Sequence, residues 1–423
     1  MKQSYLLVPV LLGLALALIS APGAAAQEAG PSAGEVLADG LLQPRGITIG
    51  PDGAIYVAEA GSGGSTEFVT DDGTTIFIGT TGRISRIDPA TGERTTVADG
   101  LPSQRSEEDE ALGPADVAFI GGTLYYVQTL GGEAWGFPDQ PTGVYRIESD
   151  GDATLLADIY EFNVENPVPR ITSGEQDDVA LGGNPYSLSV RDGVFYVVDS
   201  NYNQILRATT AGAVTRFVDF NANVVPTGIT FRASGGPFYV SQLGPGPFLP
   251  ADGKVVSVAA PSGTVAEVAS GVSMLTAVDA GPGDQLYALS FATDFAPGSG
   301  QVVRVNANGT LSPVVTGLTF ASSMEFDGDT LYVLNDGINA LGTGQVIAIE
   351  SFSTVQPPAA QPTVPPPAPA PATPTPATGI VSPDTGTGPG GSGTDGTLLI
   401  AALALIGVIA IVGGGAVAGR RSR

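Results

Sequence analysis

The chain contains no cysteine and no histidine, and it has few basic residues. It therefore cannot form disulfides, zinc sites built on Cys or His, thiol nucleophiles or a catalytic triad that needs an imidazole. Its 17 lysines and arginines face 42 aspartates and glutamates, for a formal net charge of −25. Nucleic acid is not an expected partner, because its binding depends on neutralising phosphates. Solubility through like-charge repulsion explains this acidity, and divalent-cation binding is the alternative.

Three kinds of strand recur in a fixed order between the two ends of the chain, six times each. The first kind begins as "GITIG" at 46, the second as "AIYVAE" at 54 and the third as "GRISRI" at 82. A fourth strand follows each third strand except the last, and "EVLADGL" at 35–41 supplies the missing one. Four strands repeated six times predict an all-β fold, a six-bladed β-propeller over 34–351 whose N-terminal strand closes the last blade. Two stacked β-sandwiches are the alternative, but they do not explain the sixfold order.

The two ends of the chain predict export and anchoring. Residues 1–26 combine a lysine, an apolar run and a small-residue exit, which is typical of a signal peptide. Residues 352–397 form a stalk rich in Pro, Ala and Thr and then in Gly, Ser and Thr. The uncharged stretch 398–418 is long enough for a transmembrane helix, and the basic tail 419–423 is expected in the cytoplasm.

Cell-wall attachment is an alternative to this membrane anchor. "SPDTG" at 382–386, followed by an apolar run and arginines, resembles the sorting signal of sortase-anchored wall proteins. Ser382 stands where that signal has leucine, and the resemblance would place the cut between Thr385 and Gly386. Membrane anchoring is preferred, because the apolar span satisfies the length and charge rules unaided.

Loop lengths distinguish the two faces of the predicted ring. First-to-second and third-to-fourth connections are tight turns rich in Gly, Asn and Asp, such as 50–53 and 149–151. The long connections, such as 60–81 and 163–185, all belong to the other two kinds and emerge on the opposite face. We call these the plain face and the loop-rich face. Binding residues are commonly carried by loops on a rigid scaffold, so the loop-rich face is the predicted working face.

Two stretches resemble known propeller families. "FYVVDSNYNQILRATTAG" at 195–212 resembles an NHL-type repeat. The segments 45–61 and 79–102 resemble the ScyD/ScyE family of secreted bacterial propellers, and the likeness covers 34–351. It implies the fold and export but no settled activity. The resemblance to related six-bladed lactonases and the SMP-30 type implies a cation held in the channel by acidic and amide groups. A streptogramin-lyase-like role is disfavoured, because this chain has no histidine to serve as its base.

The second strands all end on a polar residue at the loop-rich face, and these residues are expected to ring the central channel. They are Glu59, Gln128, Asp199, Gln242, Ser290 and Asn335. Near the starts of the first strands stand Arg45, Asp116, Asn184, Thr227, Thr276 and Ser323. Such a ring of oxygens suits Ca²⁺, with Glu59, Asp199 and Asp116 as its carboxylates. Hydrogen bonds to neighbouring backbone and channel water are the alternative role.

Two similar acidic loops, 106–116 and 174–184, give a second candidate calcium site. Their acids are Glu107, Glu108, Asp109, Glu110, Glu175, Asp177 and Asp178, of which Glu108, Asp109, Asp177 and Asp178 are the predicted ligands. A hydrated acidic rim is the alternative.

Aromatic residues beside proline mark the second-to-third loops: Trp135, Phe137, Phe248 and Phe295. Exposed on the loop-rich face they would anchor a partner, and buried they would cap the blades against water.

These features predict a cell-surface recognition module that binds an extracellular small molecule, polymer or protein. A calcium-dependent lactonase or similar hydrolase at the channel mouth is the alternative, with a carboxylate as its base. A purely structural surface protein is the third hypothesis.

Overall fold

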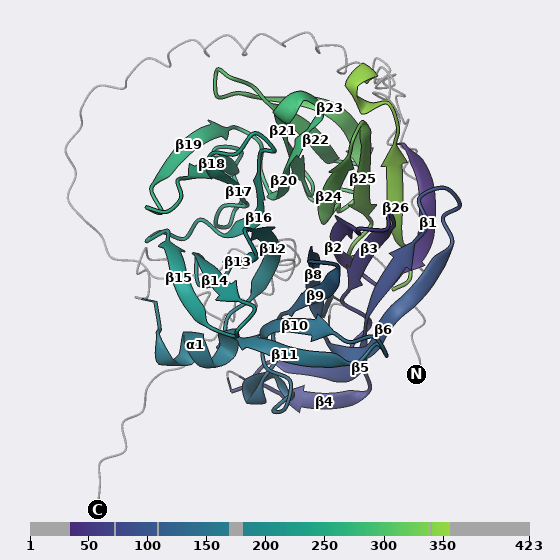
Figure 1. The fold of residues 1–423 in the computed structure, drawn as a ribbon, viewed down its shortest axis with the longest axis vertical. Coiled ribbons are helices and arrows are strands. Elements are labelled where there is room, and N and C mark those ends of the chain that lie inside the picture. The colour runs from purple at the N-terminus through teal and green to yellow at the C-terminus, as the bar shows by residue number, and fades with distance from the viewer. Residues whose placement is uncertain (1–33, 72, 108–109, 169–180, 339–340, 356–423) are drawn as a thin grey trace, which may run out of the picture.

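Six antiparallel sheets stand around a common axis and form a closed ring (Figure 1). The computed structural model describes residues 34–355 except 72, 108–109, 169–180 and 339–340. Each sheet contains the four strand kinds in order, with the first kind innermost. The predicted six-bladed all-β propeller is confirmed.

The blades, numbered I to VI along the chain, have the following strands. Blade I contains β2 (Pro44–Ile49), β3 (Ile55–Glu59), β5 (Thr75–Ile87) and β6 (Arg94–Arg105), with β4 (Thr66–Val69) and β7 (Ala111–Leu112) added. Blade II contains β8 (Pro114–Ile120), β9 (Thr123–Gln128), β10 (Gly143–Ile147) and β11 (Ala153–Asp158), and blade III contains β12 (Pro185–Arg191), β13 (Val194–Asp199), β14 (Gln204–Thr209) and β15 (Val214–Asp219). Blade IV contains β16 (Pro226–Phe231), β17 (Phe238–Gln242), β18 (Lys254–Val258) and β19 (Val265–Ser270), and blade V contains β20 (Leu275–Gly281), β21 (Gln285–Ser290), β22 (Gly300–Val305) and β23 (Leu311–Leu318). Blade VI contains β24 (Ser323–Asp327), β25 (Thr330–Asn335), β26 (Gly344–Ile349) and the N-terminal β1 (Glu35–Leu41).

The N-terminal strand closes the ring, as the repeat order predicts. β1 pairs antiparallel with β26, from Glu35 opposite Ala348 to Leu41 opposite Gly344. Leu41 is fully buried and packs with Ile47 and Ile55 of blade I across the seam. The first described strand thus holds the last blade against the first.

One apolar cluster fills each interface between neighbouring blades. In the interface of blades I and II, for example, Tyr56 and Ile84 pack with Val117 and Tyr126. A tyrosine recurs at the same register in the second strand of every blade: Tyr56, Tyr125, Tyr196, Tyr239, Tyr287 and Tyr332. This repetition of large side chains on the pleated surface is why the sequence forms equivalent blades.

Blade I is larger than the repeat pattern predicts. Its third and fourth strands run on beyond the blade, and with β4 and β7 they form an extension beside blade II. A short helix, α1 (Ile159–Glu165), follows blade II, and Asp158 caps it by accepting a hydrogen bond from the Glu161 amide. Neither feature follows the four-strand repeat, so the sequence pattern missed both.

The predicted signal peptide (1–26), most of the stalk (352–397), the transmembrane helix (398–418) and the tail (419–423) lie outside the described residues. Within 34–355, apart from the gaps given above, no helix has the length and apolarity to span a membrane.

The seam can be tested with two substitutions on the same strand. Leu41→Ala should lower the free energy of unfolding by about 2–4 kcal/mol, because it empties a fully buried site between the first and last blades. Val36→Ala should cost under about 1 kcal/mol, because Val36 is 47% exposed. Urea unfolding measures both, and equal small losses would show that the ring does not depend on β1.

Candidate ligand-binding channel

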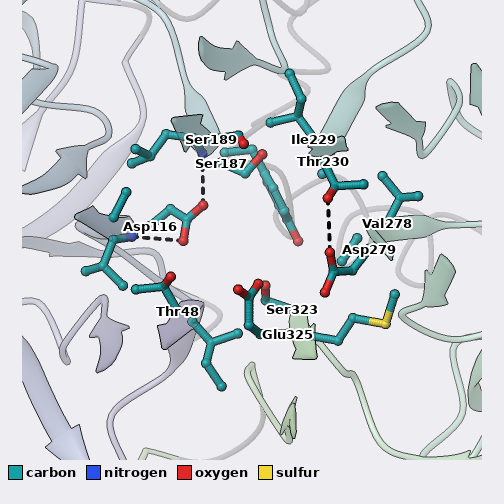
Figure 2. Close-up of a pocket in the computed structure, with 18 of the residues that line it drawn as sticks. Thr48, Asp116, Ser187, Ser189, Ile229, Thr230, Val278, Asp279, Ser323 and Glu325 are labelled. Atoms are coloured by element: carbon teal, nitrogen blue, oxygen red, sulfur yellow. Dashed lines mark hydrogen bonds between the residues drawn. The ribbon is translucent and has the colours of Figure 1, made fainter. Parts of the chain in front are cut away.

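The inner strands enclose a cavity of about 370 Å³ on the propeller axis (Figure 2). One layer of its lining lies at the register of the recurrent tyrosines, and it consists of Thr48, Ala118, Ser189, Thr230, Asp279 and Glu325. A second layer lies two residues earlier in the same strands, nearer the loop-rich face, and includes Asp116, Ser187 and Ser323. In the first of these layers every side chain except that of Ala118 carries a hydroxyl or carboxyl group.

Asp116 is buried and accepts hydrogen bonds from two backbone amides. One comes from Val117 of its own strand (2.8 Å) and the other from Leu188 of the next blade (2.9 Å). Desolvation raises the pKa of Asp116 to about 7, although both amides favour the charged form. This carboxyl links blade II to blade III while it faces the channel (Figure 2).

Asp279 links three blades in the same way. It accepts hydrogen bonds from the Thr230 hydroxyl of blade IV (3.0 Å) and from the Phe326 amide of blade VI (2.9 Å). The Ala280 amide supplies a third donor at 2.7 Å. Burial raises the pKa of Asp279 to about 6, against the effect of these donors.

Glu325 has no hydrogen-bond partner for its carboxyl among the residues that the structure describes. Its side chain points into the opening between Asp116 and Asp279 (Figure 2). Desolvation raises the pKa of Glu325 well above its ordinary value, and the nearby acids Asp279 and Asp116 add to the effect. Of the three channel carboxyls, Glu325 is the one whose position no structural bond explains.

The loop-rich end of the channel is closed. Arg45 is 7% exposed and forms an ion pair with the buried Glu110 at 3.0 Å. Tyr186 reaches from blade III to blade VI, where its hydroxyl donates to the Ser322 carbonyl at 3.2 Å. Blades III and VI are opposite in the ring, so this bond crosses the axis.

The plain-face end is the accessible one. In β2, β16 and β20 the first four residues are buried and the following residues are half-buried. The lining at this end is partly apolar and includes the half-buried Ile49, Phe119, Val190 and Phe231. These four side chains also pack against the clusters between the blades, so the cavity has a partly apolar rim, an acidic interior and a closed floor.

The polar ends of the second strands do not line this cavity. All six are buried, and none of them is among the residues that line the cavity: Glu59, Gln128, Asp199, Gln242, Ser290 and Asn335. Gln128 donates to the Pro102 carbonyl, Ser290 to the Ser273 carbonyl, and Asn335 accepts from the Thr319 amide. The expected ring around the channel is therefore wrong in its placement, because the second strand is one strand removed from the axis.

The two carboxylates of that set each bond to protein groups of their own. Glu59 forms an ion pair with Arg83 at 2.7 Å and accepts from the Leu42 amide at 2.6 Å. Asp199 accepts from the Asn184 amide and from the side-chain amides of Asn163 and Gln204, and desolvation raises its pKa.

The structure does not bring Glu59, Asp199 and Asp116 together as a calcium site. The three lie in different blades, and each has its own set of hydrogen-bond partners. Of the predicted first-strand residues, Arg45, Asp116, Thr276 and Ser323 do line the channel, whereas Asn184 and Thr227 do not.

The acidic loops are described only in part. Glu108, Asp109, Glu175, Asp177 and Asp178 lie outside the described residues. Glu107 is exposed, and Glu110 points inward to Arg45. No group of three or more acids arranged to hold a metal ion occurs among the residues of 34–355 that the structure describes.

The loop aromatics pack inside the molecule. Trp135 and Phe137 are buried under the blade I extension, and the Trp135 indole donates to the Leu181 carbonyl at 2.9 Å. Phe248 is buried against the half-buried Phe295, with ring centroids 5.7 Å apart. Of the two roles considered for these residues, the burial of Trp135, Phe137 and Phe248 fits capping of the blades and not exposed anchors.

Sequence reasoning missed Asp279, Glu325 and Tyr186. The signal for the two acids was present, because "LTAVD" and "SSMEF" carry an acid where the other first strands carry Thr, Ser or Ala. No sequence signal indicated that Tyr186 crosses the axis.

No protein-family model and no curated protein matches the chain. Among solved structures, the PQQ-bound aldose sugar dehydrogenase of Streptomyces coelicolor is 14% identical, with 75% of this chain and 96% of that chain covered and a TM-score of 0.49. Virginiamycin B lyase of Staphylococcus aureus with quinupristin is 16% identical over 75% and 98% of the two chains, with a TM-score of 0.42.

A gluconolactonase of Xanthomonas campestris is 15% identical over 75% of this chain and 98% of that chain, with a TM-score of 0.41. A sugar dehydrogenase, a lyase and a gluconolactonase are thus among the solved structures that are similar to this chain. At these identities none of their activities follows.

Glu325→Gln should raise stability at alkaline pH. A carboxyl whose pKa is raised on folding stabilises the protein below its unfolded pKa, and this contribution is lost as the pH rises through the folded pKa. Glutamine has no proton to lose, so the free energy of unfolding of the variant should exceed that of the parent by about 1–2 kcal/mol at pH 8 and differ little at pH 4. Urea unfolding at both pH values measures the gain, with the exposed Glu93→Gln as the control. A gain of equal size at both pH values would contradict a strained carboxylate at Glu325.

Proposed function

We propose that this chain is a binding module that holds a small organic cation in its central channel and admits it from the plain face. The observation that carries this proposal is the acidic cavity itself. Three carboxyls face it, and Arg45, its one basic lining residue within the described part of the chain, is already paired with Glu110. Opposite charge within a few ångströms favours a charged carboxylate, so a cation would relieve the repulsion that Glu325 experiences.

The chemistry of the lining indicates which cations would fit. An ammonium or guanidinium group suits the interior, because its N–H groups can donate to the carboxylate and hydroxyl oxygens there. The rim of Ile49, Phe119, Val190 and Phe231 suits an apolar body that follows the cationic group. A small organic cation with an apolar portion matches both regions.

The anchor predicted from the sequence places the module at the cell surface. In this proposal residues 1–26 direct export and 398–418 hold the chain in the membrane, with wall attachment as the alternative. The described chain ends beside the plain face, because the Phe352 amide donates to the Asp329 carbonyl in the β24–β25 turn at 2.8 Å. The stalk would then leave from the face that bears the channel mouth. Membership of the ScyD/ScyE family stays a prediction.

The calcium-dependent hydrolase is the weaker proposal. Its predicted carboxylates Glu59 and Asp199 are bonded inside blades I and III. A larger partner on the loop-rich face is also less well supported than the channel, because three of the four aromatic anchors proposed for it are buried.

A single thiol in the channel tests the proposal, since the chain has no cysteine of its own. Thr48 lines the cavity, so T48C should react with small methanethiosulfonate reagents. A cationic reagent should react at least about tenfold faster than an anionic one of similar size, because the carboxyls attract it. Reaction rates at pH 8 measure the ratio.

The whole protein is acidic, so a surface thiol at T96C, on the exposed side of β6, supplies the matched control. The ratio for T48C should exceed that for T96C, and adding Glu325→Gln should reduce the difference. A thiol in T48C that reacts with neither reagent would overturn the channel site. Equal ratios at the two positions would leave an accessible channel but contradict its preference for cations.

A further inference from the structure

Tyr186 stands between two cavities. The channel cavity of about 370 Å³ and a void of about 10 Å³ on its loop-rich side share two lining residues, Arg45 and Tyr186. The void is otherwise lined by residues of blades I to III, among them Gly113, Ala115 and Thr129. These two shared side chains form the wall that separates the channel from the interior of the loop-rich face.

The two parts of this wall are fixed differently. Arg45 lies to one side, held by Glu110 and by the Ala111 carbonyl within the loop that joins blades I and II. Tyr186 extends across the axis, and its hydroxyl is bonded to the opposite blade. Removal of the phenol would therefore open the wall at its centre, whereas Arg45 covers only its margin.

The acceptor of this bond is itself held in place. Ser322 donates its hydroxyl to the Pro44 carbonyl of blade I at 2.7 Å, and its amide donates to the Leu334 carbonyl at 3.0 Å. The far end of the Tyr186 bridge is thus attached to both sides of the seam between blades VI and I. A bridge fixed at both ends is a rigid floor rather than a side chain free to swing.

We infer that Tyr186 is the specificity-determining floor of the channel site. It makes the channel a blind pocket, sets the depth to which a ligand can enter and prevents passage to the loop-rich face. The inference rests on the proposed function, because a floor matters only if the channel is entered from the plain face. The ring closes the passage, and the hydroxyl adds a bond to the opposite blade.

A thiol behind the floor tests this directly. Ala115 lines the small void and is 5% exposed, so A115C should react slowly with a small cationic methanethiosulfonate reagent in the otherwise unchanged full chain. Tyr186→Ala should raise that rate at least tenfold by joining the two cavities. Tyr186→Phe should leave it within about threefold, because the ring remains although the hydrogen bond is lost.

Three controls separate the possible failures. T48C reports access to the channel itself, so its lack of reaction would overturn the proposed function and not the role of Tyr186. A208C, in the core of blade III and fully buried, should not react faster in the Tyr186→Ala background, since a general loosening would affect it too. Tyr186→Val, which suits a strand, replaces Tyr186→Ala if the latter does not fold. An unchanged A115C rate in a folded variant without the ring, with T48C reactive, would refute the floor.

Discussion

The pairing of β1 with β26 is the constraint on which the rest of the molecule depends. A ring of blades left open would expose strand edges and lose one of its six interfaces. Because the seam is closed by strand pairing and by Leu41, the six inner strands are held at fixed distances around one axis. The channel exists because those strands cannot approach more closely, and its lining is decided by which residues fall at two register positions of each first strand.

The channel carboxyls have two different roles. Asp116 and Asp279 accept backbone and hydroxyl hydrogen bonds from neighbouring blades, so they join the ring as well as charge its centre. Each is held at a cost, because burial disfavours its ionised form. Desolvation also disfavours the ionised form of Glu325, whose carboxyl has no hydrogen-bond partner among the described residues. A half-buried carboxyl without a hydrogen-bond partner among the described residues is where a ligand is expected, and the acids around it favour a cation over a neutral molecule.

Much of the architecture could be predicted from the sequence, because each blade repeats the same strand order and the same tyrosine. The role of "EVLADGL" followed from counting strands, and the structure places it on β26. The site was harder to predict. The ends of the second strands look like a polar ring in sequence, but the propeller places the first strand on the axis, so Glu59 and Asp199 bond inside their blades. The acids at 279 and 325 were visible as departures from the repeat, whereas the crossing by Tyr186 depends on two blades far apart in the chain.

The most direct test of this account is a crystal structure of the protein soaked with benzylamine at pH 8. The account predicts the probe inside the channel, with its ammonium group within hydrogen-bond distance of the Glu325 carboxylate and its ring toward Phe119 and Phe231. A channel that holds only water at saturating probe, or a probe bound only on the loop-rich face, would contradict it.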